Sequence, residues 1–127
     1  MDQGSSSPLV SIIVNCYNGE KFLTHALNSV LNQTYKNWEL IFWDNKSIDK
    51  SKEILKSYKE KRFKYFLASA HTKLYEARNL AIKESKGEFI ALLDVDDWWT
   101  DDKLEKQLTY FKNSNVGLVY GNCWIVD

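Results

Sequence analysis

The sequence predicts an α/β fold in which a mostly parallel sheet carries helices on both faces. From Pro8 onward, short apolar runs alternate with segments whose apolar residues recur at helical spacing. The run 89–93 holds five apolar residues in succession, which is typical of a central strand covered on both faces. Strands and helices that alternate along one chain favour crossover connections, and these produce a parallel sheet.

Five short apolar runs are predicted as strands. They cover residues 9–14, 38–43, 63–67, 89–93 and 116–120. In a parallel sheet the carboxyl ends of the strands lie along one edge, and ligands bind beyond that edge. The polar residues that follow these strands are therefore expected to share one surface.

Four helical patterns separate the predicted strands. They cover residues 22–31, 54–58, 74–82 and 104–111, where apolar side chains recur three or four positions apart. The candidate residues for capping or ending these helices are Asn18, Ser47 or Asp49, Gly87, and Thr100.

The composition is that of one globular domain, with 127 residues of which 44% are hydrophobic and 27% charged. We expect residues 1–7 to form a flexible polar tail and residues 8–127 to form the domain. Seventeen basic residues balance seventeen acidic ones, so the charge favours neither nucleic acid nor an anionic membrane, and a small partner is expected. Cys16 and Cys123 are interpreted as free thiols in a reducing intracellular setting, with a disulfide as the alternative.

Three carboxylates directly follow the fourth predicted strand. Asp94, Asp96 and Asp97 have no cation among them to offset their charge. Mg²⁺ and Mn²⁺ prefer oxygen ligands and commonly bridge protein carboxylates to the phosphates of a substrate. The cluster therefore predicts a divalent-metal site. The alternative is that these residues cap the following helix or form a turn.

Other polar residues at the strand ends suit a nucleotide. Tyr17 follows the first strand and could stack on a base, and Asp44 follows the second and could accept from a base or ribose. The alternatives are that Tyr17 fills the sheet edge and that Asp44 caps a turn. Neither GxGxxG nor GxxxxGK[ST] follows the first strand, so the phosphate charge is left to a metal.

The histidines are not interpreted as catalytic. His25 and His71 have no Ser or Cys partner at motif spacing, so both are predicted to be structural or exposed. Trp98 and Trp99 follow the acids, and at least one of them is expected to pack in the core. The alternative for the other is to face the cleft, where an aromatic ring suits the apolar face of a sugar.

Five segments, in order along the chain, resemble the inverting nucleotide-sugar glycosyltransferases of family 2, which have the Rossmann-like GT-A fold. The similarity runs from about Pro8 to the end of the chain. The segments are Val10–Asn18, Ser29–Tyr35, Trp38–Asp49, Ala77–Asn79 and Leu93–Trp98. They look like the family's Tyr-Asn turn, its Ser-Val-Leu-x-Gln-Thr-Tyr helix end, its Asp-Asp-Gly-Ser-x-Asp strand end, its Ala-Arg-Asn and its Asp-x-Asp-Asp.

The resemblance implies a role for each matched residue. Tyr17 and Asp44 would hold the nucleobase, Asp94 the ribose or diphosphate, and Asp96 the Mn²⁺ or Mg²⁺, while Arg78 would lie near the nucleotide. The chain departs from the family pattern in two places. Asn45-Lys46 replaces Asp-Gly, and Leu80 stands where Gly often follows Ala-Arg-Asn. These departures concern the donor pocket and leave the metal site untouched.

The implied reaction transfers a sugar from a nucleoside diphosphate, with a UDP-sugar as the expected donor, to a saccharide or lipid-linked acceptor hydroxyl with inversion. A metal would stabilise the departing diphosphate, and a carboxylate base would take the acceptor's proton. By resemblance that base lies beyond Asp127, so no catalytic residue is assigned in this chain. We expect the chain to be the donor-binding half of a longer cytoplasmic enzyme. The missing segments would allow peripheral association with the cytoplasmic face of a membrane.

Two other functions stay open at this point. A non-catalytic nucleotide-binding module needs the same Tyr17, Asp44 and Asp96 but no base. An Asp-dependent phosphohydrolase also uses Asp-x-Asp after a strand, although there the acids follow the first strand. The sugar, the base, the acceptor and the oligomeric state are left open by the sequence.

Overall fold

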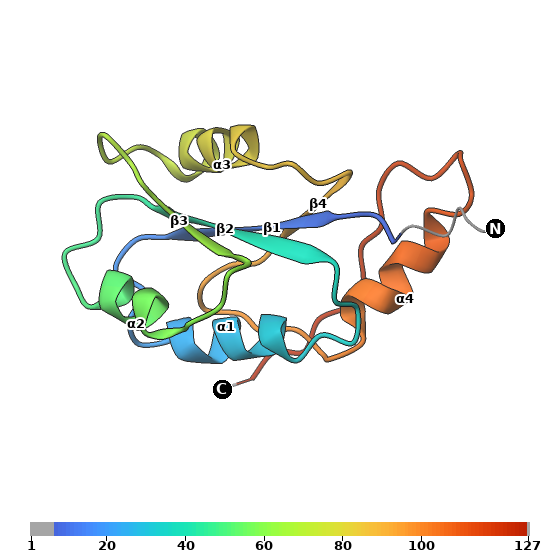
Figure 1. Ribbon diagram of the computed structural model, residues 1–127, viewed down its shortest axis with the longest axis horizontal. Helices are drawn as coiled ribbons and strands as arrows, with labels where there is room; N and C mark the ends of the chain where they lie inside the picture. The colour runs from blue at the N-terminus through green and yellow to red at the C-terminus, as the bar shows by residue number, and fades with distance from the viewer. Residues whose placement is uncertain (1–6, 127) are drawn as a thin grey trace.

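The computed structural model describes residues 7–126, and its elements follow the predicted alternation of strands and helices (Figure 1). The strands are β1 (Val10–Cys16), β2 (Trp38–Asp44), β3 (Phe63–Leu67) and β4 (Phe89–Leu92). The helices are α1 (Leu23–Leu31), α2 (Ser51–Ser57), α3 (Leu74–Lys83) and α4 (Lys103–Tyr110). Residues 1–6 of the predicted tail, and Asp127, lie outside the described residues.

The four strands form one parallel sheet in the order β3-β2-β1-β4. Helices α1 and α2 cover one face of the sheet, and α3 covers the other (Figure 1). Because successive side chains of a strand point to opposite faces, β1 contributes to two cores. Ile12 belongs to the core that contains Leu27 of α1, whereas Ile13 belongs to the core that contains Ala77 of α3. The predicted fold class is therefore confirmed.

The fourth strand is not the central strand that its apolar run predicted. β4 pairs only with β1 among the described residues, and the side chains of Ile90 and Leu92 are 42% and 48% exposed. An apolar run indicates that a strand can be buried. The position of that strand in the sheet depends on which other strands pair with it. The prediction of burial on both faces was wrong for this part of the chain.

The predicted fifth strand, residues 116–120, is also wrong. The segment has no regular structure, and Leu118 and Tyr120 are 80% and 87% exposed. Its β-branched and aromatic residues have strand propensity, but a strand forms only where a neighbour supplies hydrogen bonds.

Three of the residues predicted to cap or end helices do not do so. Asn18 does not cap α1, because its Oδ1 accepts a hydrogen bond from the Ile48 N–H. The residue before α4 is Asp102, not Thr100. α3 ends at Lys83, so Gly87 does not terminate it. Loops that meet in the fold compete for the same side chains, and this competition overrides local capping preferences.

The cap predicted for α2 was only partly found. Asp49 Oδ1 accepts from the N–H of Ser51, the first residue of α2, at 2.9 Å. Ser47 instead accepts from the Asn18 N–H at 2.9 Å. Asp49 was therefore the better of the two predicted caps.

Both cysteines are free thiols, as predicted, with Cys16 buried and Cys123 exposed. Within residues 7–126, no helix is both long enough and apolar enough to cross a bilayer.

Glu39 is a buried carboxylate that joins three strands near the amino-terminal side of the sheet. It is 3% exposed. Its Oε1 accepts from the Ser11 hydroxyl and from the Lys86 N–H, each at 2.7 Å, and its Oε2 accepts from Lys64 Nζ at 3.0 Å. Burial raises the pKa of Glu39, but these donors outweigh it and hold the pKa below the ordinary range of a glutamate.

This arrangement predicts a loss of stability in acid. A group whose pKa is lowered by folding stabilises the native state above its unfolded pKa, which is about 4.3 for Glu, and that stabilisation disappears as the pH falls through the folded value. We expect Glu39→Gln to be less stable than the native protein at pH 7 and to lose less stability between neutral and acid pH. Urea unfolding at a series of pH values gives the free energy of unfolding of both proteins as a function of pH. An equal loss of stability in acid would contradict the role of Glu39, because every other carboxylate is common to the two proteins.

Candidate functional site

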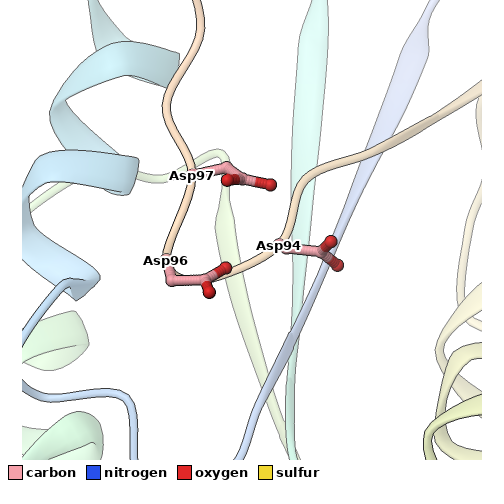
Figure 2. A group of neighbouring side chains, drawn as sticks. All are labelled: Asp94, Asp96 and Asp97. Atoms are coloured by element: carbon pink, nitrogen blue, oxygen red, sulfur yellow. The ribbon is translucent and has the colours of Figure 1, made fainter. Parts of the chain in front are cut away.

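The loop after β4 brings three carboxylates together. One oxygen each from Asp94, Asp96 and Asp97 lies within 4.8 Å of the others, and all three residues are exposed. Figure 2 shows the three side chains on this one loop, which a hydrogen bond from the Asp97 N–H to the Asp94 carbonyl closes at 3.0 Å. Burial, and the nearby charges of Asp96 and Asp94, raise the pKa of Asp97. The cluster has the oxygen ligands and the negative charge that Mg²⁺ and Mn²⁺ prefer.

Arg78 of α3 reaches the edge of this cluster. Its Nη2 donates to Asp94 Oδ1 at 3.2 Å, so two residues matched by separate sequence segments are brought together. The Nε of Arg78 is buried and has no hydrogen-bond partner among the described residues. A cation beside three acids limits their mutual repulsion and leaves donors free for an anionic ligand.

A cavity of about 230 Å³ lies at the carboxyl ends of β1 and β2. It is lined by Asn15, Cys16, Tyr17, Asn45, His71, Thr72, Lys73, Leu74 and Ala77. Tyr17 is 51% exposed, and its ring lies 4.4 Å from the ring of His71 at an angle of 59°. Tyr17 therefore lies half-exposed beside the cavity, and its stacking on a base stays a prediction.

Asp44 is held within the protein. It is 2% exposed, its Oδ2 accepts from the Tyr65 hydroxyl at 2.6 Å, and its Oδ1 accepts from the Ser47 N–H at 2.7 Å. Burial and the neighbouring carboxylate raise the pKa of Tyr65, so this hydroxyl stays a donor. The bond to Ser47 is the turn cap that the sequence left open as an alternative. A contact between Asp44 and a nucleobase stays a prediction.

The turn that carries Tyr17 is locked to the loop after Asp44 by reciprocal hydrogen bonds. The Ile48 N–H donates to Asn18, and the Gly19 N–H donates to Ser51 Oγ at 3.0 Å. A Cβ at Gly19 would lie 2.7 Å from a methyl carbon of Val95, the residue between two of the aspartates. The turn is thus packed tightly against both the loop after β2 and the aspartate loop.

The Asp-Gly position where the chain departs from the family pattern has a conformational cost. Lys46 has φ 70°, in the left-handed region that glycine adopts most readily. A lysine therefore holds a backbone conformation here that glycine adopts at lower cost.

Of the histidines and tryptophans, Trp99 packs in the core as predicted, whereas His71 lines the cavity beside Tyr17, and the non-catalytic role of both histidines stays a prediction. His25 is exposed on α1 and stacks on Trp98, with ring centroids 4.3 Å apart and planes 12° apart. Trp99 is 8% exposed and belongs to the core. His71 Nδ1 lies 3.0 Å from the Asn45 carbonyl, which can only accept, so this nitrogen carries the hydrogen.

Sequence reasoning assigned no role to Asn15. This residue lines the cavity, and its Nδ2 is buried without a hydrogen-bond partner among the described residues. The only sequence signal was a polar residue near the end of an apolar strand, and many structural residues give the same signal. Asp97 belongs to the acidic run for which the sequence predicted a divalent metal, but the resemblance to the family gave it no individual role.

Known proteins are similar to this chain in sequence and in fold. The sequence model described as Glycosyl transferase family 2 matches residues 11–127. A glycosyltransferase of Haemophilus influenzae is 41% identical over 94% of this chain and 49% of its own length. The Escherichia coli protein named UDP-Glc:alpha-D-GlcNAc-diphosphoundecaprenol beta-1,3-glucosyltransferase WfgD is 39% identical over 94% of this chain and 47% of its own length.

A solved structure is similar to this chain in fold. Residues 1–349 of S. aureus TarS, crystallised in complex with UDP-GlcNAc, have a TM-score of 0.77 and 29% identity over 81% of this chain and 31% of that one. The chain spans about half the length of the curated relatives that it matches. The family match over nearly the whole chain, together with relatives near 40% identity, leads to one conclusion. The chain belongs to glycosyltransferase family 2 and has the GT-A fold.

Proposed function

We propose that this chain binds the nucleoside-diphosphate sugar of an inverting, metal-dependent glycosyl transfer to an acceptor hydroxyl. The observation that carries the proposal is the group of three carboxylates, which lies beside Arg78 at the same edge of the sheet as the aromatic cavity. The carboxylate cluster would face the phosphates of a sugar nucleotide, and the cavity would hold its nucleoside. The family assignment removes the phosphohydrolase alternative.

Each candidate residue receives a specific task. Asp96 would hold Mn²⁺ or Mg²⁺, and Asp94 would contact the ribose or diphosphate, while Asp97 adds a third oxygen donor to the same loop. Tyr17 would stack on the base. Arg78, whose Nη2 pairs with Asp94, would donate to the nucleotide from the N–H groups at the end of its guanidinium.

The chemistry divides between this chain and segments beyond it. The metal, when bound, supplies positive charge that stabilises the departing diphosphate. The side chains of this chain would orient the donor so that attack on the sugar occurs in line, and Arg78 would offset part of the charge of its phosphates. We propose that the base that takes the acceptor's proton lies outside the residues of this chain and that this chain has a donor-binding role.

The relatives support a proposal for donor and acceptor. The name of WfgD specifies a UDP-sugar donor and a diphosphoundecaprenol-linked acceptor, and TarS was crystallised with UDP-GlcNAc. We therefore propose a UDP-sugar as donor and a saccharide or lipid-linked saccharide as acceptor. For the full-length protein we propose action at the cytoplasmic face of a membrane, where segments outside this chain would supply the association.

The test is calorimetric titration of the 127-residue chain with UDP, with Mn²⁺ and again after its removal by EDTA. We expect binding with Mn²⁺ that weakens by about tenfold or more in EDTA, because two phosphates then face uncompensated carboxylates. Equal affinity in both conditions would contradict metal dependence. No UDP binding in either condition would contradict donor binding itself.

A further inference from the structure

The aspartate loop, residues 93–99, is anchored to the core at both of its ends. The Leu93 N–H donates to the Ile13 carbonyl at 3.0 Å, and the Leu93 side chain is 2% exposed. At the other end Trp99 is buried and packs in the core that contains Leu27 of α1. The carboxylates of the loop lie between these anchors, where most side chains are exposed. Their arrangement therefore depends on the contacts that the middle of the loop makes.

Two contacts to other segments hold the first half of the loop. Asp94 pairs with Arg78 of α3 at 3.2 Å. Val95 packs against the turn at Gly19, where an added Cβ would lie 2.7 Å from a methyl carbon of Val95. Both contacts come from parts of the chain that are distant in sequence, so they fix Asp94 relative to the sheet and its helices.

The second half of the loop, residues 96–98, is held in a different way. Among residues 7–126 it makes no hydrogen bond to another segment, and the Asp97 N–H donates to Asp94 within the loop itself. Trp98 instead stacks on His25 of α1, with ring centroids 4.3 Å apart and planes 12° apart. This aromatic pair therefore connects the second half of the loop to a helix.

The helix gives the aromatic pair a fixed base. Leu23 and Leu27 of α1 are fully buried in the core, whereas His25 lies on the exposed side of the helix. Nearly parallel aromatic rings in contact attract each other by more than the effect of the area that they bury. Trp98 follows Asp97 directly, so a restraint on the Trp98 ring also restrains the backbone that carries the Asp97 carboxylate.

Such a restraint matters because the three carboxylates repel one another. One oxygen from each lies within 4.8 Å of the others, and like charges at this distance favour a loop that moves them apart. A loop that already has its bound conformation avoids the cost of ordering when a ligand binds. A contact that keeps the carboxylates together before a cation arrives therefore increases the affinity for that cation.

We propose that His25 is a positioning residue for the metal site. Its stack on Trp98 holds Asp96 and Asp97 beside Asp94, so that the loop offers its oxygens to a divalent cation as one preformed group. This inference rests on the proposed function, and it adds a residue of α1 that acts through Trp98 rather than by contact with the cation or the nucleotide.

The decisive variants are His25→Ala, which removes the ring, and His25→Phe, which keeps a ring that can stack. Calorimetry measures the affinity of each chain for UDP in the presence of Mn²⁺. We expect His25→Ala to bind UDP about three- to tenfold more weakly than the native chain, because the attraction of the aromatic pair no longer holds the loop. We expect His25→Phe to stay within about twofold of the native affinity, since its ring restores the stack.

A double-variant cycle tests whether His25 acts through Trp98. Trp98→Ala is expected to weaken binding by at least as much as His25→Ala. Adding His25→Ala to Trp98→Ala is expected to change the affinity by less than about twofold, because the stack is already lost. Thr24→Ala is the matched control, since it truncates the neighbouring exposed residue of α1, which contributes only its backbone carbonyl to a hydrogen bond among residues 7–126. It should keep the native affinity.

A measurement without metal separates positioning from a general loss of stability. Amide hydrogen exchange of residues 94–98 is expected to be faster in His25→Ala than in the native chain and to return to the native rate in His25→Phe. Exchange in β1 and the midpoint of urea unfolding are expected to stay the same in all three chains. A merely structural role would instead lower the urea midpoint of His25→Ala and speed exchange throughout the sheet.

The outcomes separate this inference from the proposed function. Unchanged UDP affinity or unchanged loop exchange in His25→Ala overturns the inference and leaves donor binding intact. An equal loss of affinity in His25→Ala and His25→Phe also overturns it, and so does a loss that persists in full when His25→Ala is added to Trp98→Ala. Absence of Mn²⁺-dependent UDP binding by the native chain overturns the proposed function and the inference with it.

Discussion

Replacing Asp96 by Asn is expected to abolish Mn²⁺-dependent binding of UDP while leaving the fold intact. The amide that replaces the carboxylate carries no charge and is a weak ligand for a hard cation. Loss of an outer-shell partner of a metal ligand already costs about 10–100-fold, so loss of the ligand itself is expected to cost about 100-fold or more. Asp96 is exposed, so the free energy of unfolding of the variant should differ from that of the native protein by less than about 0.5 kcal/mol.

Asp101→Asn is the matched control for this variant. It removes one negative charge from another exposed aspartate five positions along the chain, outside the carboxylate cluster. Calorimetry with UDP and Mn²⁺ compares the two variants, and urea unfolding checks their stability. Equal Mn²⁺ dependence in Asp96→Asn and Asp101→Asn would show that net charge, not coordination by Asp96, governs binding.

Gly87→Ala is expected to destabilise the protein strongly. A Cβ at this position would lie 2.7 Å from the Leu9 carbonyl oxygen and 2.7 Å from both the N and the Oγ of Ser11. Two of these atoms are backbone atoms at the start of β1, so they cannot rotate away as a side chain would. The bonds from the Gly87 N–H to Ser11 and from the Glu88 N–H to Leu9, each 2.8 Å, would lengthen as the strands separate.

The expected cost is about 3 kcal/mol, the upper end of the usual range for overpacking, which corresponds to a fall in melting temperature of roughly 10 °C. Urea unfolding gives the free energy directly. Gly117→Ala is the control, because a Cβ there would meet nothing within 4 Å, and it should change stability by less than about 0.5 kcal/mol. Equal stability of the two variants would show that the start of β4 can move away from β1 at little cost.

The parts of the site that the sequence predicted are local or follow from topology. Asp94, Asp96 and Asp97 are neighbours in the chain, so a single turn is enough to bring their oxygens together. Tyr17 follows β1 directly, and parallel pairing brings the end of β1 beside the end of β2. Residues that directly follow parallel strands in the sequence therefore lie at the same edge of the sheet.

The parts that it missed depend on partners distant in sequence. Asn18 is a good helix cap by type, but its oxygen is taken by Ile48 from another loop. Residues 116–120 have the composition of a strand, yet no neighbour pairs with them among residues 7–126. Secondary-structure propensity indicates which structures a segment can adopt. Which of them forms depends on the hydrogen-bond partners that distant segments supply.

The α/β class, the positions of β1 to β4, the acidic loop and the family could all be predicted from the sequence, because apolar periodicity and contiguous motifs are local properties. The hydrogen bond from Tyr65 to Asp44 and the ion pair of Arg78 with Asp94 became visible in the folded chain alone. The same holds for the Asn15 amide nitrogen, which is buried without a hydrogen-bond partner among residues 7–126. Each of these features depends on hydrogen bonds and burial that several chain segments create at once, and no local pattern encodes them.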